Sequence, residues 1–416
     1  MLRLLTAVWN NVQISNEADD VTSGIDSVKY YLYHPSVDSK GSFNLPTKEE
    51  LESFEWLTWA GDLSLDSDQQ TIVYQRMEDK AGNISYVNTS GAIIIDKTAP
   101  AKPNIEITTP ESGKGTYNGD VNGRIHVEDQ EAGGTYSGLK TVKVEVLNGD
   151  SVTQSQTYEV GSKQDRIKAY DANVTVDSKL NNSNFVKIRV TTTDWAGNVS
   201  TEIQELAIDT VAPRIEVNFD STEAKNGRYF NQARTATVRV YERNFDPNAV
   251  NITVNGGKAK VSEWKIGSDA GKSDENVSTA TITFSEDGDY TFNIQATDAV
   301  GNSSEYKHTD VFTIDKVVPE LGMDFVNSSG KAIGVSKDEK NPTYDRASMK
   351  AVLSVKERNF DPKDVVLNIT EKDSKGQATS SYEYSKALLT NKGSWIEKDG
   401  VYTYTLNDFD KDGNYG

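Results

Sequence analysis

Cysteine is absent from the 416-residue chain, so no disulfide holds any part of its fold together. Histidine occurs only at His34, His126 and His308, and the sequence has no His-Glu-x-x-His, Gly-x-Ser-x-Gly or phosphate-binding glycine motif. No apolar run reaches the roughly 18 residues of a transmembrane helix. We therefore expect no enzyme activity and no membrane insertion in this fragment.

Positive charge is also scarce. The chain has 44 Lys and Arg against 63 Asp and Glu, a net charge of -19 and a pI near 4.7. A negative field of this size repels phosphate backbones, so we expect no nucleic-acid partner. Hydrophobic residues make up 36%, yet 19 Tyr, 12 Phe and 6 Trp can anchor several small cores. At the usual domain size of about 100 to 150 residues, the length predicts three to four domains.

Two short motifs recur about every 105 to 115 residues, which is the size of one β-sandwich. Asp-x-x-Gly-Asn occupies residues 79–83, 194–198 and 298–302. Ile-Asp-x-x-x-Pro occupies residues 95–100, 208–213 and 314–319. The chain is therefore predicted to be a tandem array of related domains.

Each motif has a physical interpretation. In Asp-x-x-Gly-Asn, the Asp side chain closes an Asx turn and the Gly supplies a positive φ, which predicts a hairpin between the last two strands of a sandwich. In Ile-Asp-x-x-x-Pro, the Ile ends the last strand, and the Pro suits the edge where the next domain begins. The joint is so short that neighbouring domains should nearly touch in an elongated array. The predicted domains are 1–97, 98–210, 211–316 and 317–416, with the first incomplete at its N-terminus and the fourth truncated at its C-terminus.

The repeats form two pairs. The third and fourth carry Glu-Arg-Asn-Phe-Asp-Pro at residues 242–247 and 357–362, where Asp as N-cap and Pro as first helical residue favour one helical turn. The first and second carry Ser-Gly-Ile at 23–25 and Ser-Gly-Leu at 137–139 instead. Residues 287–292, Asp-Gly-Asp-Tyr-Thr-Phe, fit the tyrosine corner of immunoglobulin-like sandwiches, with the Phe in the core.

Together, the hairpin motif, the Ile-Asp-Lys-Thr-Ala-Pro joint and the Glu-Arg-Asn-Phe-Asp-Pro loop resemble the tandem immunoglobulin-like repeats of large bacterial cell-surface proteins. The resemblance covers nearly the whole chain. It implies an all-β fold of tandem immunoglobulin-like β-sandwich domains, export to the cell surface or secretion, and a role as a stalk or adhesive module without catalysis. We expect a monomeric rod.

Calcium is the one cofactor that the acidic pattern would accommodate, because hard cations prefer oxygen ligands. One hypothesis places an ion between domains, where a joint carboxylate approaches a hairpin carboxylate. The joint carboxylates are Asp96, Asp209 and Asp315, and the hairpin carboxylates are Asp79, Asp194 and Asp298. Turn capping alone also accounts for each hairpin Asp.

A second calcium pattern lies near the end of the chain. Asp408-x-Asp410-x-Asp412-Gly413 copies the opening of an EF-hand loop. The same residues fit the tyrosine-corner register of residues 284–290, and we favour that structural interpretation.

A ligand-binding surface is predicted in the first repeat. Residues 46–50, Pro-Thr-Lys-Glu-Glu, have a capping-box form and should open a short helix toward the aromatic residues that follow. Strand alternation would leave two tyrosines outward. Exposed rings could stack on a sugar or anchor a protein, and core or edge packing is the alternative. The candidate residues are Tyr31, Tyr33, Trp56 and Trp59.

The leading functional interpretation is a non-catalytic stalk or adhesin fragment, extracellular, that projects or forms a binding surface for a host glycan or glycoprotein. One alternative is a module that binds a host protein such as an immunoglobulin or a mucin glycoprotein. The other is a set of accessory domains of a secreted carbohydrate-degrading enzyme.

Overall fold

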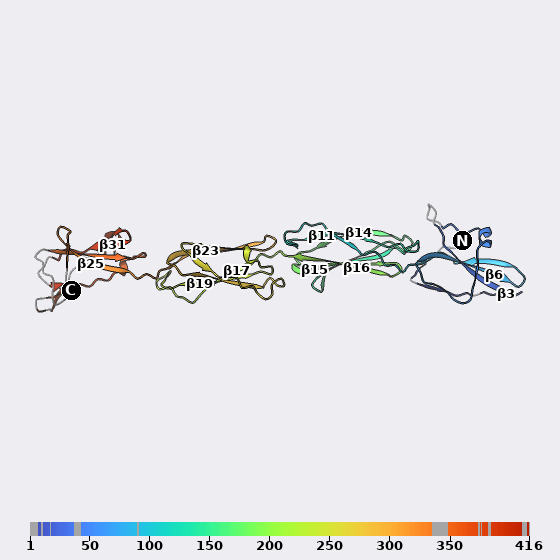
Figure 1. Cartoon of the computed structure of the whole chain (residues 1–416), viewed down its shortest axis with the longest axis horizontal. Helices are drawn as coiled ribbons and strands as arrows, with labels where there is room; N and C mark the ends of the chain where they lie inside the picture. The colour runs from blue at the N-terminus through green and yellow to red at the C-terminus, as the bar shows by residue number, and fades with distance from the viewer. Residues whose placement is uncertain are drawn as a thin grey trace. The chain divides into compact units, whose positions relative to one another are not determined.

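The computed structural model describes the chain except residues 1–6, 10, 17, 37–42, 90, 335–347, 373, 374, 376, 382, 383, 410–413 and 416 (Figure 1). The described residues are mostly β-strand, and every sheet takes its strands from a single predicted repeat. The all-β class of tandem immunoglobulin-like sandwiches is thereby confirmed. No helix in the described part is long and apolar enough to cross a membrane.

Contacts divide the chain into two compact units. The first comprises residues 1–221, 234–285 and 289–311, and the second comprises residues 222–233, 286–288 and 312–416. The first unit thus holds the first two repeats and most of the third.

The first repeat packs apolar residues against both faces of its main sheet. A six-stranded sheet has the order β1-β8-β6-β3-β4 with β7 beside β6, and β2 pairs with β5. Helix α1 (Lys48–Glu52) covers one face, and its N-terminus has the predicted capping box formed by Thr47 and Glu50. The strands are β1 (Ala7–Trp9), β2 (Val12–Ile14), β3 (Ile25–Tyr33), β4 (Leu57–Thr58), β5 (Leu63–Leu65), β6 (Gln69–Asp79), β7 (Ile84–Asn88) and β8 (Ile93–Ile95).

The second repeat is a two-layer sandwich. A five-stranded sheet, β10-β16-β15-β12-β13, packs on a three-stranded sheet, β14-β11-β9. Strict alternation of buried and exposed residues along β11 places Val121, Ile125 and Val127 in the core. The strands are β9 (Asn104–Ile107), β10 (Thr116–Tyr117), β11 (Val121–Glu128), β12 (Leu139–Asn148), β13 (Ser151–Glu159), β14 (Ala169–Val176), β15 (Ser183–Asp194) and β16 (Val199–Ile208).

The third repeat has a related strand plan. One sheet has the order β17-β19-β22-β21, and β20 pairs with β23. Tyr290 is fully buried, its hydroxyl donates to the carbonyl of Lys258, and Phe292 lies in the core as predicted. The elements are β17 (Arg214–Phe219), β18 (Tyr229–Phe230), β19 (Arg234–Tyr241), η1 (Pro247–Ala249), β20 (Val250–Asn255), β21 (Ala259–Val261), β22 (Val277–Phe284), β23 (Gly288–Thr297) and β24 (Ser303–Ile314).

The fourth repeat lies in the second unit. Its sheets have the orders β26-β25-β27-β31-β30 and β29-β28-β32. The helical turns predicted after Asp246 and Asp361 are both present as 3-10 helices, each capped by the Asp side chain and begun by Pro. The elements are β25 (Glu320–Asn327), β26 (Ala332–Ile333), β27 (Met349–Lys356), η2 (Pro362–Asp364), β28 (Thr370–Lys372), β29 (Ala378–Ser381), α2 (Lys386–Leu389), η3 (Lys392–Ser394), β30 (Ile396–Lys398), β31 (Val401–Thr405) and β32 (Asn414–Tyr415).

Candidate metal centre at the domain joints

The hairpin Asp residues cap their turns as the sequence predicts. The Oδ1 atom of Asp194, at the end of β15, accepts a hydrogen bond of 2.8 Å from the backbone N–H of Asn198. Its Oδ2 atom accepts one of 2.8 Å from the Asn198 side chain. Asp79 and Asp298 make the same bonds with the Asn four residues later. The Asx-turn interpretation is therefore confirmed for all three hairpins.

A cluster of three carboxylates lies at the joint between the first and second repeats. Asp96 follows β8, Asp129 follows β11, and Asp194 ends β15. One oxygen from each carboxylate lies within 4.8 Å of the other two. All three residues are buried, with at most 1% of their surface exposed. The first repeat thus supplies one carboxylate and the second repeat supplies two.

Backbone N–H groups hold these carboxylates in place. The Ser-Gly-Leu motif of the second repeat supplies two of them: Ser137 N donates to Asp96 Oδ2, and Gly138 N donates to Asp129 Oδ2, both at 2.7 Å. Thr98 N donates to Asp96 Oδ1 at 3.1 Å. The Oδ1 atom of Asp129 is buried and accepts no hydrogen bond from the described residues. A buried carboxylate oxygen without a donor is costly, so this atom would gain from a cationic or proton-donating partner.

Electrostatics at this joint favour a positive charge. Burial, with the nearby carboxylate of Asp96 adding to its effect, raises the pKa of Asp129 to about 7 and that of Asp194 to about 6. Two unit charges about 5 Å apart repel by about 3 to 4 kcal/mol at an effective dielectric constant of about 20. No ion pair of the described residues involves any of the three.

The oxygen spacing fits calcium. Calcium binds six to eight oxygens at about 2.3 to 2.6 Å, so two oxygens on one ion lie at most about 5 Å apart. The observed spread of up to 4.8 Å is within this limit. Hard carboxylate oxygens with no sulfur or imidazole beside them are also the ligand set that calcium prefers over transition metals.

The joint between the second and third repeats has a related cluster with one difference. Asp209 follows β16, Glu242 follows β19, and Asp298 begins the hairpin after β23; one oxygen from each lies within 4.8 Å of the other two. Burial raises the pKa of Glu242 to about 7. Here, however, the guanidinium of Arg243 lies 3.2 Å from Asp209 Oδ1, and both side chains are almost completely buried.

Of the six predicted metal ligands, the structure brings four into these two clusters. Asp96 meets Asp194, and Asp209 meets Asp298, so these two joint carboxylates lie beside the hairpin of the following domain. Asp79 and Asp315 are in neither cluster: the Asp79 carboxylate bonds its own hairpin, and Asp315 accepts a hydrogen bond of 2.5 Å from Asn359. Asp410, Asp412 and Gly413 of the EF-hand-like pattern lie outside the described residues.

Sequence reasoning missed Asp129 and Glu242. Both occupy the same position in their repeats: Asp129 directly follows β11, and Glu242 directly follows β19. The only sequence feature that could have identified these two residues is that both repeats have an acidic residue at this strand end, although the sequences that follow differ. It is weak, because an acidic residue after a strand is ordinary surface chemistry.

The four aromatic residues predicted to form a binding surface are divided between the two faces of the first sheet. Tyr31 stacks on Phe54 with ring centroids 4.2 Å apart, whereas Trp59 packs edge-on against Tyr30 on the other face. The Trp56 indole donates to a carbonyl of helix α1, and the Tyr33 hydroxyl donates to Asn44 O. All four rings are half-buried, and together they do not make one exposed platform.

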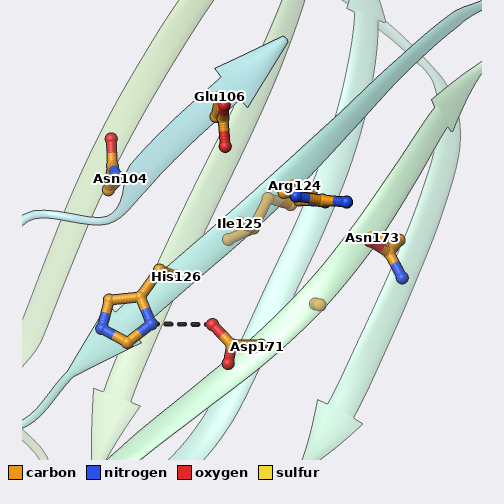
Figure 2. A pocket seen from close by; sticks show the side chains of 8 residues that line it. Asn104, Glu106, Arg124, Ile125, His126, Asp171 and Asn173 are labelled. Carbon is orange, nitrogen blue, oxygen red and sulfur yellow. Dashed lines mark hydrogen bonds and ion pairs between the residues drawn. The ribbon is translucent and has the colours of Figure 1, made fainter. Parts of the chain in front are cut away.

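A polar hollow lies on the outer face of the three-stranded sheet of the second repeat (Figure 2). Asn104 and Glu106 of β9, Arg124 and His126 of β11, and Asp171 of β14 line it. His126 Nδ1 lies 2.7 Å from Asp171 Oδ1, and both side chains are largely exposed. This surface pair differs from the buried carboxylates at the joints, because solvent already satisfies its polar groups.

No protein-family model matches the chain, and no curated protein matches it significantly. Among solved structures, a tetra-tandem repeat in the extending region of a large adhesion protein aligns over 97% of this chain and 90% of that chain, with 14% identity and a TM-score of 0.34. The N-terminal eight Ig domains of Down Syndrome Cell Adhesion Molecule align over 99% and 66%, with 8% identity and a TM-score of 0.22. An S-layer protein aligns over 92% and 66%, with 13% identity and a TM-score of 0.18.

Proposed function

We propose that the chain is a non-catalytic array of immunoglobulin-like domains displayed outside a bacterial cell, and that calcium fixes its first joint. One observation carries the proposal: Asp96 from one domain and Asp129 and Asp194 from the next form a buried triad in which Asp129 Oδ1 has no hydrogen-bond partner among the described residues. Because the ligands come from both sides, an ion bound there would link the two domains directly.

The energetics suit a protein that works outside the cell. Calcium sites of extracellular modules have dissociation constants of about 10⁻⁴ to 10⁻³ M. An ion that binds only the folded, docked joint stabilises it by about 2.7 kcal/mol at 100 times its dissociation constant. A joint with three buried carboxylates and no basic side chain paired with them would therefore be weakly held at low calcium concentration and firmly held at high calcium concentration.

The adhesive part of the proposal concerns what the array presents. Most repeats would act as spacers, and a host glycan or glycoprotein would be the partner. Support comes from the tandem β-sandwich architecture. Immobilised mucin and immunoglobulin, offered separately to the full chain, test this part: saturable binding to either favours an adhesive role, and binding to neither favours a spacer.

Calorimetry tests the calcium site. The full chain is stripped with EDTA and titrated with calcium, and the heat of binding and the melting temperature are recorded. We expect Asp129→Asn to remove one binding site and most of the rise in melting temperature. Asp79→Asn is the matched control, because half-buried Asp79 caps the same hairpin motif away from both clusters.

Terbium luminescence can show where in the chain the ion binds. Trp195 directly follows Asp194, so terbium bound at this joint should be sensitised by excitation of its indole. The sensitised emission should disappear in Asp129→Asn and in excess calcium. Absence of calcium heat, of a melting shift and of terbium emission in the unaltered chain would falsify the calcium site.

A further inference from the structure

Arg243 is the only basic residue of the described chain whose side chain is buried inside a joint carboxylate cluster. Its side chain is 3% exposed. Its Nη1 atom donates to Asn182 O and its Nη2 atom donates to Ile208 O, each at 3.1 Å, and Nη2 also lies 3.2 Å from Asp209 Oδ1. Arg243 belongs to the third repeat, whereas these three partners belong to the second.

The third repeat also helps to hold the guanidinium. Its Nε atom lies 3.4 Å from the carboxylate of Asp274. The guanidinium therefore contacts a carboxylate from each of the two domains and two backbone carbonyls from one. A planar group with five N–H donors suits such a set, and an arginine keeps its charge at every physiological pH.

Among the residues that the structure describes, no arginine or lysine forms an ion pair with the three carboxylates of the first joint. Asp129 and Glu242 are equivalent in position, directly after β11 and β19, so Gln130 stands where the other joint has Arg243. Gln130 is exposed, while Arg243 is buried. At the first joint, Asp129 has a buried carboxylate oxygen without a hydrogen-bond partner among the described residues. At the second joint, the corresponding Glu242 has no such oxygen.

We infer that Arg243 takes, at the second joint, the place that a divalent cation takes at the first. The second joint is then held by a charge that belongs to the chain itself and does not depend on the surrounding metal concentration. The first joint is held by an ion from solution. Neighbouring joints of one array thus differ in kind: one responds to calcium and the next does not. This inference rests on the proposed calcium site at the first joint.

Ion counting on the full chain tests the inference. The number of calcium ions bound is measured for the unaltered chain, Asp129→Asn and Glu242→Gln by calorimetry after EDTA treatment. We expect Asp129→Asn to lose one ion and Glu242→Gln to lose none. Because each count is a difference from the unaltered chain, calcium bound elsewhere does not affect it.

A gain-of-site variant makes the test sharper. Arg243→Gln gives the second joint the residue that the first joint has, and we expect it to bind one more ion than the unaltered chain. Adding Glu242→Gln to this variant should remove that ion. Arg243→Lys is the matched control: it keeps the positive charge and should gain no ion. Circular dichroism and the melting profile of the other domains report whether each variant is folded.

The outcomes separate the inference from the proposed function. If the unaltered chain loses an ion with Glu242→Gln as well as with Asp129→Asn, both joints bind metal and the inference is wrong while the proposed calcium site stands. If folded Arg243→Gln gains no ion, the inference is also wrong. If Asp129→Asn loses no ion, the proposed calcium site fails, and the inference fails with it.

Discussion

The side-chain amide of Asn198 donates a hydrogen bond of 3.0 Å to the backbone carbonyl of Asp96, which belongs to the preceding repeat. Asn302 makes the equivalent bond of 3.3 Å to the carbonyl of Asp209. The Asn of the recurring Asp-x-x-Gly-Asn motif therefore has two roles. It completes its own hairpin and it fastens the hairpin to the joint.

Replacing this Asn should affect the joint as well as the hairpin. We expect Asn198→Ala to lower the free energy of unfolding of the second repeat by about 1 to 2 kcal/mol, since it loses both the turn bond and the bond to Asp96. Asn83→Ala is the matched control, because exposed Asn83 bonds Asp79 within its own hairpin, and it should cost about 0.5 to 1 kcal/mol. Equal losses in calorimetry would contradict the role at the joint.

Two adjacent glycines offer a steric test of the same joint. Gly133 and Gly134 both have positive φ, so alanine at either adds about 1 kcal/mol of backbone strain. A Cβ at Gly133 would lie 1.9 Å from the backbone oxygen of Asp68 in the first repeat, whereas a Cβ at Gly134 meets nothing within 4 Å. We expect Gly133→Ala to open the joint to proteolysis between residues 97 and 103, and Gly134→Ala to leave cleavage unchanged.

His308 gives the third repeat a pH dependence. Its ring packs against Phe219 and Phe292, with centroids 5.1 and 5.2 Å away, and burial lowers its pKa from the usual value, with the charge of Arg234 adding to the effect. The unfolded chain then binds a proton at pH values where the folded chain does not. The stability that His308 contributes is therefore complete above a pH of about 6.5 and is lost as the pH falls through the folded pKa.

The measurement compares melting temperatures of the unaltered chain and His308→Gln at pH 7.5 and pH 5. We expect the acid-induced loss to be smaller in His308→Gln. A direct titration by NMR should place the imidazole pKa below its usual value, and a value at or above the usual one would contradict the prediction.

The aromatic cluster of the first repeat should be structural. Trp56 packs on Tyr86 with ring centroids 5.6 Å apart, and its indole donates to Leu51 O at 3.0 Å. We expect Trp56→Ala to cost about 2 to 3 kcal/mol of stability, below the full cost of a completely buried ring. Leu57→Ala, at an adjacent position that is 54% exposed, should change stability by less than about 0.5 kcal/mol. An unchanged denaturation midpoint for Trp56→Ala would argue that the ring is free for a ligand.

Local chemistry made much of the fold predictable. Asp-x-x-Gly-Asn determines a turn through its own atoms, and Asp-Pro determines a helical turn in the same way, so both were found from the sequence. Alternating patterns such as that of β11 likewise indicate which face is buried. These features depend on residues close together in the chain.

The candidate site depends on contacts over long distances. The repeat pattern suggested that joint carboxylates lie near hairpin carboxylates, but not which ones meet. Asp129 joins Asp96 and Asp194 only because β11 ends at that joint. The buried Arg243 could not be told from a surface arginine, since its equivalent in the fourth repeat, Arg358, is exposed. Alternation along β3 shows which residues share a face of the sheet, and it predicts that Tyr31 and Tyr33 lie on the face away from the core. It does not show that helix α1 covers this face.

The short strand β10 runs parallel to the end of β16, with Thr116 opposite Ala207 and Tyr117 opposite Ile208, and the N–H of Asp209 continues the ladder to Tyr117 O. If the two ends of the second repeat were pulled apart, the force would reach β10 from its N-terminal side and β16 from its C-terminal end. Because the two strands are parallel, pulling slides one along the other and loads all of these hydrogen bonds at once, whereas an antiparallel pair pulled from one end would open bond by bond. The same residue, Asp209, closes this ladder and contacts Arg243. Under such a pull, the force on the domain and its attachment to the next domain would meet at a single aspartate.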